Sequence, residues 1–514
     1  MTTKTHTAPL PTVLIVLAAL FASVSLPLSL YAESGPPKTA DRPYRIESVT
    51  YEINGRTRDW ALADILDLEE GMTFPSETAF ETFLLRQEQI LVNQRVLQDG
   101  MITYRVLDNA GEHALRDETV QAAAVHNVAV TVTVKDTWNF IILPYFKYDS
   151  NSGLLLSLRT RDYNFFGTMQ ALEIDFDYER TEDDRNVYTI ASEFQLPFNL
   201  LNRRWEYIFK ESFEFDGTDI DFKISNGLGY FFTWLGLDWE AIYTESFRYL
   251  SDDDDGDYDY FTSDFELGST IDTGLDLFLY GPLAYRPAVY TEWNYKPGGI
   301  SRARGGFTVG FEHTLDAGDY DWIGNYRRGR TVELVNDNGY NIMHKTWDQE
   351  IAFKTAVYQP LWQPSPTEWP KAGISTGVSG FYLINGADED QDDAAKAARG
   401  VLDNTMNGDL GLFLNLDAAV TVWTVKPVFE AQFGVFLDVA YVRDLRGDFY
   451  PDTSFQSDRD LRYGAGIEVV GFPLFARSLY LRGSLGTDLV AVSEGTNPLS
   501  SKIREIFIGL GHHY

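Results

Sequence analysis

The sequence predicts an all-β transmembrane β-barrel of about 16 to 18 antiparallel strands, preceded by one small α+β domain. The barrel is predicted by a long alternation of residue types, in which the even positions of residues 410–422 are apolar. After Pro427 the odd positions of residues 429–441 are apolar, while Glu430 and Asp438 lie between them. Successive side chains of a strand point to opposite faces, so each of these strands has one apolar face. Such strands fit a barrel with lipid outside and water or packed polar groups inside.

The composition of the 514-residue chain agrees with this class. Its mean hydropathy is only −0.22, but alternating strands never give the long apolar run that hydropathy detects. The 34 Phe and 29 Tyr residues supply aromatic side chains of the kind that barrels place at both membrane interfaces. The formal net charge of −34 argues against nucleic acid as a partner. The absence of cysteine fits an exported protein and excludes a cysteine-attached lipid anchor.

Residues 1–32 are predicted to be a secretory signal peptide. Lys4 gives a weakly basic start, residues 13–26 form an uncharged, mainly apolar run, and Ala32 offers a small residue at a cleavage site. The alternative is a membrane-anchor helix, but the run is shorter than the ~20 residues that a membrane-spanning helix needs. Residues 33–43 contain Gly, Pro and charged residues and are expected to be a flexible lead-in.

Residues 44–136 are expected to form the small α+β domain. Ser76 is a suitable N-cap for the longer of its two helices. The expected elements are, in order, a strand at 44–51, a short helix at 59–66, a helix at 77–93, and strands at 95–107 and 125–135.

Residues 137–514 contain eighteen segments that alternate like barrel strands, with the weakest boundaries between 199 and 300. An even number of strands would set the first and last strands side by side and close the sheet. Long charged connections are expected on the outer side, at 251–257, 386–408, 443–461 and 491–502. Two other connections, 316–328 and 359–370, are longer than the short turns expected on the inner side.

The sequence predicts no enzymatic activity, no metal and no cofactor. Residues 373–377 match a nucleophile-elbow pattern, but they lie within an alternating strand rather than at a strand–helix turn. The acidic residues 252–257 fail the calcium-loop pattern, which would require Ser251 and Thr262 at ligand positions. His512 and His513, as neighbours on a strand, would point to opposite faces.

Three motifs, in this order along the chain, resemble those of the BamA superfamily of outer-membrane assembly and translocation proteins. Residues 162–168 (Asp-Tyr-Asn-Phe-Phe-Gly-Thr) are similar to a turn motif near the start of the family's barrel, with Met169 in place of the usual Gly. Arg399-Gly400 resembles the Arg-Gly-aromatic motif of a long loop, with Val401 in place of the aromatic residue. Residues 436–438 (Phe-Leu-Asp) resemble a Phe-x-Asp motif on the second strand after that loop, and five predicted strands follow Arg399, as in the family.

The resemblance implies a fold, a location and a function. The α+β domain would be a POTRA-like periplasmic module, and the barrel would lie in the bacterial outer membrane. The protein would assemble or translocate unfolded or secreted β-rich client proteins, in contact with outer-membrane lipid and with periplasmic accessory proteins. The family's barrels have 16 strands. The alternative is a passive outer-membrane pore or receptor that keeps only the architecture.

In the family the long loop folds back into the barrel lumen, and the resemblance implies the same for Arg399 and Gly400. The alternation places Asp417, Glu430 and Asp438 on the lumenal side, where they are candidate partners for the guanidinium. Arginine can form a bidentate pair with a carboxylate. The alternative is an arginine in solvent. Asp438 matches the family motif, but the sequence leaves the choice of partner open.

The first and last strands both carry residues that weaken strand pairing. Pro144 cannot donate a ladder hydrogen bond, and Gly509 and Gly511 pack little and cost backbone entropy. The chain ends at Tyr514, which resembles the terminal aromatic residue of outer-membrane barrels. Two hypotheses follow: a lateral seam that opens to lipid or to a client strand, or a bend in a permanently closed barrel.

Overall fold

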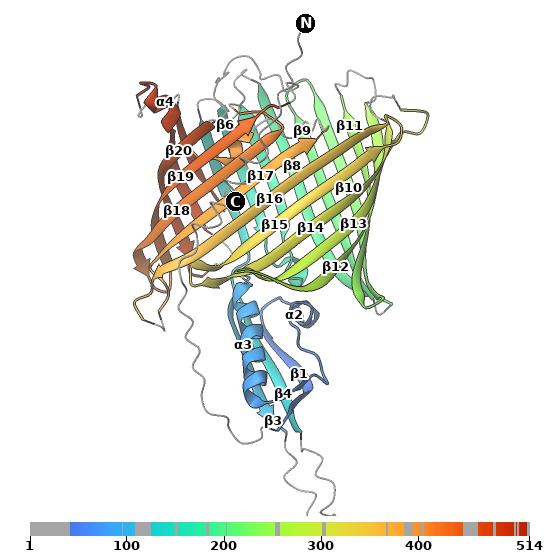
Figure 1. Ribbon diagram of the computed structural model, residues 1–514, viewed down its shortest axis with the longest axis vertical. Helices are drawn as coiled ribbons and strands as arrows, with labels where there is room; N and C mark the ends of the chain where they lie inside the picture. The colour runs from blue at the N-terminus through green and yellow to red at the C-terminus, as the bar shows by residue number, and fades with distance from the viewer. Residues whose placement is uncertain are drawn as a thin grey trace, which may run out of the picture.

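The computed structural model describes most of the chain between residues 42 and 510. It does not describe residues 1–41, 95, 108–124, 150–152, 181–184, 202, 252–257, 301–304, 366–367, 385–393, 402–405, 446–460, 476–479, 498–499, 501–502 and 511–514. The expected signal peptide lies outside the described residues, and so do Gly511 and Tyr514. In the described part, the chain forms a barrel with a small domain beneath one end (Figure 1).

In its described residues, the small domain combines a four-stranded sheet with two helices. Its sheet has the order β2-β1-β4-β3, in which β1 runs parallel to β4 and the other neighbours are antiparallel. The longer helix begins after Ser76, whose side chain accepts a hydrogen bond from the Ala79 amide at 3.2 Å. The elements are β1 (Tyr44–Asn54), α2 (Asp59–Ile65), β2 (Thr73–Phe74), α3 (Glu77–Asn93), β3 (Leu97–Val106) and β4 (His126–Asp136).

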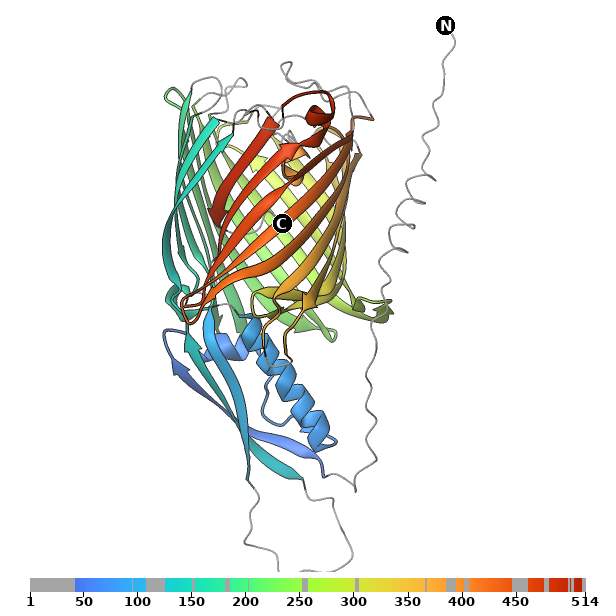
Figure 2. The same ribbon diagram turned by 90° about the vertical axis from the view of Figure 1, so that its left-hand side faces the viewer.

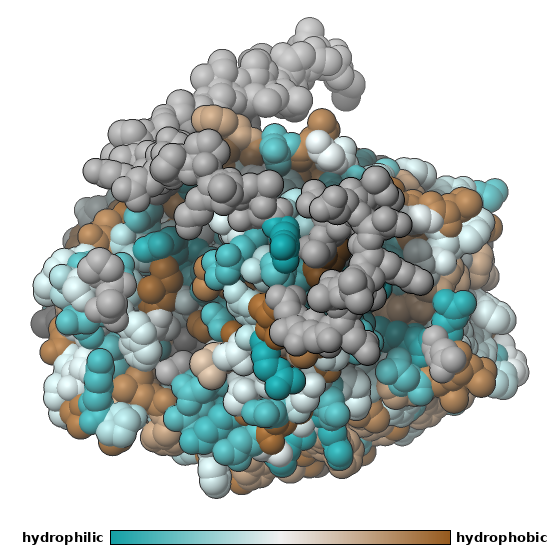
Figure 3. All heavy atoms as spheres, turned by 90° about the horizontal axis from the view of Figure 1, so that it is seen from below, coloured by the Kyte–Doolittle hydropathy of each residue, from teal (hydrophilic) through white to brown (hydrophobic). Residues whose placement is uncertain are grey.

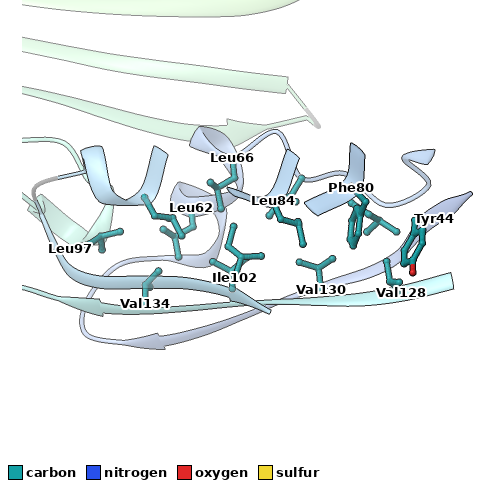
Figure 4. Packing of buried hydrophobic residues seen from close by; sticks show 14 residues of the cluster. Tyr44, Leu62, Leu66, Phe80, Leu84, Leu97, Ile102, Val128, Val130 and Val134 are labelled. Carbon is teal, nitrogen blue, oxygen red and sulfur yellow. The ribbon is translucent and has the colours of Figure 1, made fainter. Parts of the chain in front are cut away.

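An apolar core lies between this sheet and the helices (Figure 4). Phe80 and Leu84 are four residues apart on α3, so they share the helix face that is turned to the sheet. Alternate valines of β4 meet them and are all buried, namely Val128, Val130, Val132 and Val134. The domain therefore has a hydrophobic core of its own.

The barrel strands each pair antiparallel with the next strand in sequence, and β22 pairs with β5, so the sheet closes. Within the described residues the barrel has 18 strands, the upper value of the prediction, which confirms the predicted fold class. The strands are β5 (Phe140–Asp149), β6 (Gly153–Asp162), β7 (Leu172–Arg180), β8 (Asn186–Leu200), β9 (Arg203–Phe215), β10 (Ile220–Trp234), β11 (Leu237–Leu250), β12 (Asp259–Leu277), β13 (Gly281–Tyr295), β14 (Gly306–Ile323), β15 (Tyr326–Asn341), β16 (Thr346–Trp362), β17 (Ala372–Ile384), β18 (Leu410–Val425), β19 (Phe429–Arg443), β20 (Leu461–Pro473), β21 (Leu481–Asp488) and β22 (Arg504–Leu510). The connections that the structure describes contain three short helices, η1 (Phe165–Gly167), η3 (Ala394–Ala397) and α4 (Leu489–Ser493).

The expected long connection at residues 316–328 is wrong, because most of it is strand. β14 continues to Ile323 and β15 begins at Tyr326, which leaves a two-residue turn. Asp319 lies opposite Arg330 across this hairpin, and Asp321 lies opposite Arg328. Charges on both strands interrupt the apolar alternation by which a strand is recognised. β16 likewise continues into the second expected connection.

The alternation along β19 separates two environments. Val435 and Leu437 are 49% and 38% exposed on the outer face, whereas Phe436 and Asp438 are 4% and 0% exposed on the lumenal face. This is the arrangement expected of a strand between lipid and a packed lumen. None of the helices in the described residues is long and apolar enough to cross a membrane.

A polar network joins the small domain to the turn between β6 and β7. Asp136, at the end of β4, accepts hydrogen bonds from Thr57 Oγ1 at 2.6 Å and from Asn164 Nδ2 at 3.1 Å. Asn164 Nδ2 also donates to Thr57 Oγ1 at 2.8 Å. Arg56 Nη2 lies 2.9 Å from Asp162 Oδ1. The turn with the first of the three motifs therefore holds the domain against the barrel.

Gly167 allows the backbones of the two parts to approach closely. Its φ of +78° is in the left-handed region, which disfavours side chains. A Cβ atom at this position would lie 2.0 Å from the Arg56 carbonyl oxygen. The Gly167 carbonyl accepts a hydrogen bond from the Arg58 amide at 2.9 Å. Residue 167 is thus a glycine for two reasons: its left-handed backbone conformation, and the lack of room for a side chain beside Arg56.

Other contacts hold the domain to different strands at the same end of the barrel (Figure 2). Asn93, at the end of α3, donates from Nδ2 to Asp321 Oδ1 of β14 at 3.2 Å. Asp64 of α2 lies 2.9 Å from Arg204 of β9. Seen from below, this face shows hydrophilic and hydrophobic residues interspersed (Figure 3). The domain is therefore anchored by polar contacts at several points around the barrel's lower end.

Candidate functional site

The described part of the long loop lies against the inner wall of the barrel. Ala395, Ala398 and Val401 are buried, and they pack in one cluster with Phe413 of β18 and Ala440 of β19. Both strand residues point to the lumen by the alternation of their strands. Val401, which stands where the family has an aromatic residue, is 1% exposed. The loop is thus held by a small apolar contact with the lumenal face.

Arg399 is buried beside two lumenal carboxylates. Its Nε and Nη2 donate to the two carboxylate oxygens of Asp438, each at 2.8 Å, which is a bidentate pair. The Arg399 backbone amide also donates to Asp438 Oδ2 at 2.8 Å. The remaining Nη1 lies 2.7 Å from Asp417 Oδ1. The guanidinium carbon is 4.2 Å from the centroid of the Phe436 ring, a cation–π distance.

Glu430 lies at a different place in the barrel. Its Oε1 accepts a hydrogen bond from Asn325 at 3.0 Å, and its Oε2 lies 3.4 Å from Lys371 Nζ. Glu430 and Asp438 are eight positions apart along β19, which is roughly 26 Å at about 3.3 Å per residue. Of the three candidate carboxylates, the structure brings Asp438 and Asp417 to Arg399 and leaves Glu430 near the other end of the strand.

Two further residues belong to this cluster and were not singled out in the sequence. Glu468 of β20 lies 3.5 Å from Arg399 Nη1 and 2.9 Å from Nε of Arg482 on β21. Both are buried, with Arg482 only 1% exposed. Extending the lumenal phase of the alternation along β20 and β21 would have found them, because both occupy inward positions. The cluster therefore contains two guanidinium groups and three carboxylates, and Glu468 lies between the two arginines. Each buried charge thus has a partner of opposite sign, without which burial would be costly.

Gly400 brings the loop into contact with three successive strands. Its φ of +77° is left-handed, and a Cβ there would lie 2.9 Å from the Thr487 amide nitrogen of β21. A Cβ on Gly464 of β20 would lie 2.1 Å from the Arg399 carbonyl oxygen. The Gly400 amide donates to Glu505 Oε2 of β22 at 2.6 Å. The Arg-Gly motif thus contacts the last strand of the barrel as well as β19.

The closure between β5 and β22 is short. In the described residues, the register runs from Glu505 opposite Asp149 to Ile508 opposite Phe146. Pro144 lies beyond this stretch, opposite Leu158 of β6. By contrast, β6 pairs with β5 over the whole length from Phe140 to Asp149. The seam is therefore the barrel junction with the shortest described ladder.

Comparisons with known proteins give likenesses of structure. The chain is similar to CdiB from Acinetobacter baumannii, with a TM-score of 0.47, 11% identity, and coverage of 91% of this chain and 73% of that chain. It is similar to CdiB from Escherichia coli, with a TM-score of 0.43, 9% identity and 99% coverage of both chains. It is also similar to BamA from Haemophilus ducreyi lacking POTRA domains 1–3, with a TM-score of 0.39, 12% identity, and coverage of 91% of this chain and 84% of that chain.

No family model and no curated protein matches the sequence. A loop arginine, buried and bidentate with a wall carboxylate, holds the loop inside the lumen. The same loop reaches the last strand through Gly400 and Glu505. The loop is thus bonded both to β19 and to β22, one of the two strands that form the seam.

Proposed function

We propose that this protein is a bacterial outer-membrane assembly or translocation factor of the BamA superfamily. The observation that carries this proposal is the buried bidentate pair of Arg399 and Asp438, which joins an inward-folded loop to the barrel wall. The order of the three motifs and the five strands β18 to β22 after the Arg-Gly motif support it. The small domain then lies in the periplasm as a POTRA-like module, following a signal peptide at residues 1–32.

The small domain offers one open sheet edge to a client strand. β2 covers only Tyr44 and Arg45 of β1, and on this side no backbone partner is found for residues 48–54 among the described residues. The opposite edge, at β3, is partly covered, because the Ile102 amide donates to Glu88 Oε1 at 2.8 Å. An unpaired edge is a template for an added strand. We therefore assign client docking to β1.

An open groove lies beside this edge. It has a volume of about 750 Å³ and is lined by Tyr51 and Ile53 of β1 together with Phe165 and Phe166 of the barrel turn. Phe166 is 65% exposed and has a φ of +53°, an uncommon conformation for an aromatic residue. Strain of this kind often marks a functional position. Charged and polar residues complete the lining, namely Arg56, Thr57, Arg58, Asp59 and Asp162. The groove would therefore receive an extended client segment that carries both apolar and polar side chains.

In the proposed mechanism, a client segment docked at β1 passes to the seam between β5 and β22. The seam opens towards lipid, and its exposed strand edges pair with the client until the client leaves. No covalent chemistry is needed, so the protein acts as a catalyst of assembly and is not an enzyme in the usual sense. The partners are outer-membrane lipid, unfolded or secreted β-rich clients and periplasmic accessory proteins.

Depletion of the protein in its host tests this function. The amounts of folded outer-membrane barrels and of secreted β-rich proteins should fall, and the wild-type gene should restore them. A second arm would lock the seam with cysteines at Tyr148 and Ile506, which lie opposite each other in register. A control pair at Val289 and Phe311 would bridge β13 and β14. Loss of activity on oxidation of the first pair only, with return on reduction, is expected.

The second candidate function is a passive pore or receptor. One observation favours it: a cavity of about 570 Å³ extends across the wall strands β9 to β14, and its mixed lining includes the charged residues Arg204, Glu240 and Glu312. Conductance of the purified protein in planar bilayers distinguishes the two functions. Steady conductance together with unchanged client levels after depletion would establish the pore and reject the assembly function.

A further inference from the structure

We propose that four side chains form a clasp on the lumenal face of the seam and hold it closed: Arg159 of β6, Tyr145 of β5, Phe507 of β22 and Arg482 of β21. This inference rests on the proposed function, because a clasp has a role only if the seam opens. It identifies positioning residues that neither the sequence motifs nor the register of the strands reveal.

The four side chains form a continuous stack across the seam. The guanidinium carbon of Arg159 lies 4.2 Å from the centroid of the Tyr145 ring. The Tyr145 and Phe507 ring centroids are 5.9 Å apart, with an interplanar angle of 68°. The guanidinium carbon of Arg482 lies 5.5 Å from the centroid of Phe507. Edge-to-face rings and cations over ring faces are both attractive arrangements.

The clasp is placed where the backbone ladder ends. The register between β22 and β5 extends from Glu505 to Ile508, and Tyr145 directly precedes Phe146, the last β5 residue in it. Tyr145 and Phe507 are each 7% exposed, so their contact is shielded from water. The side chains therefore extend the closure of the barrel beyond the described hydrogen bonds.

Gly509 gives the two rings the space to meet. A Cβ atom on Gly509 would lie 2.4 Å from Cε2 of Tyr145 and 2.8 Å from Cζ of Phe507. Any larger residue would displace at least one ring from the stack. The glycine that the sequence suggested as a weakness of the last strand is thus a requirement of the clasp.

Arg482 connects the clasp to the loop. Its Nε donates to Glu468 Oε2 at 2.9 Å, and Glu468 lies 3.5 Å from Arg399, which is paired with Asp438. Nη1 and Nη2 of Arg482 have no hydrogen-bond partner among the described residues, so Arg482 is held mainly by Glu468 and the Phe507 ring. Arg482 therefore contributes to the clasp through the Phe507 ring and joins it to the loop through Glu468.

Hydrogen–deuterium exchange of the purified full chain in lipid nanodiscs tests the clasp without any client. Tyr145→Leu and Phe507→Leu should raise exchange of the amides of β5 and β22 by about threefold to tenfold. Tyr145→Phe, which keeps the ring, should remain within about twofold of the wild type. Gly509→Ala should behave like the leucine variants, because it separates the rings without removing either.

A matched control removes an aromatic ring from a cross-strand pair away from the seam. The ring centroids of Phe261 on β12 and Phe247 on β11 are 5.2 Å apart. Phe261→Leu should leave the amide exchange of β5 and β22 unchanged. Heat-modifiable migration on gels verifies that each variant is a folded barrel. Wild-type exchange at the seam in the folded Tyr145→Leu and Gly509→Ala variants would overturn the clasp.

The exchange experiment and the client experiment can fail independently. If clasp variants raise exchange at the seam but depletion leaves client levels unchanged, the clasp stands and the assembly function falls. If depletion reduces client levels but the clasp variants exchange like the wild type, the assembly function stands and the clasp falls.

Discussion

At the scale of single residues, the central feature is the number of bonds that converge on Arg399. Asp438 alone accepts three of its hydrogen bonds, including one from the backbone, and Asp417 lies next to the remaining nitrogen. Lysine has a single ammonium group and could not reproduce this fork. The pair is buried, so removal of Arg399 leaves the Asp438 carboxylate without its cation, whereas Arg399 without Asp438 keeps Asp417 beside it.

Arg399→Ala should release the loop. Breaking a buried ion pair by removing one partner costs about 3–5 kcal/mol, mainly because the remaining charge is left unpaired. External protease should then cleave within residues 385–409 in intact cells, while Arg399→Lys should give partial protection. Arg248→Ala, which removes an arginine paired with Asp221 elsewhere on the wall, is the control. Wild-type protection in Arg399→Ala would contradict the tether.

Substitutions of Asp438 and Glu430 should show which of these candidate carboxylates holds the loop. Asp438→Asn should expose the loop to protease as Arg399→Ala does, because an amide cannot balance the guanidinium charge. Glu430→Gln should leave the loop protected, because Glu430 contacts Asn325 and Lys371 instead. The same protease assay measures both variants. Equal cleavage of the two would show that the loop responds to general loss of lumenal charge.

At the scale of elements, the turn between β6 and β7 is the joint between the two domains. Its Asn164 is 0% exposed and bridges Thr57 and Asp136 of the small domain. The turn packs so closely that only a glycine fits at residue 167. The domain's orientation under the barrel is therefore set by a few backbone and polar contacts, and single substitutions can change it.

Gly167→Ala should loosen the joint. The left-handed conformation costs about 1–2 kcal/mol for a residue with a side chain, and the new Cβ would also overlap the Arg56 carbonyl. Gly236 has a similar φ of +76° with open space around it, so Gly236→Ala isolates the conformational cost. Limited proteolysis between β4 and β5 should accelerate only in Gly167→Ala. Equal rates in the two variants would show that the close approach is unimportant.

At the scale of the whole molecule, the barrel and the small domain have separate sources of stability. The domain is held by its own apolar core, and the barrel by a closed hydrogen-bonded sheet with packed lumenal charges. The contacts between them are mostly polar. Each part should therefore fold when the other is altered.

Deletion of residues 44–133 should leave a folded barrel that handles clients poorly. The barrel strands begin at β5, after the deletion, and their pairing involves no strand of the small domain. Heat-modifiable migration should persist, while the levels of client proteins should fall towards those of the depleted strain. A truncated barrel with full activity would make the small domain a spacer and would favour the passive-pore function.

The alternation of residue types was enough to predict the strands, their faces and the closed sheet. In lipid every backbone donor and acceptor must be satisfied within the protein, so long strands with one apolar face can only close on themselves. The prediction was wrong at a hairpin outside the apolar alternation, and not between residues 199 and 300, where the boundaries were expected to be weakest. At the hairpin of β14 and β15, charged residues such as Asp319 and Arg330 interrupt the apolar alternation, so the strands were not recognised there.

Which side chains meet inside the barrel depends on the register, which residue periodicity does not encode. Asp438 and Glu430 share one face of one strand, but the position of the loop along the lumen decides that only Asp438 reaches Arg399. Tyr145 and Phe507 are far apart in sequence and meet only because closure sets β5 beside β22. Local pattern therefore determines the direction in which each side chain points, and the closed tertiary structure alone decides what it touches.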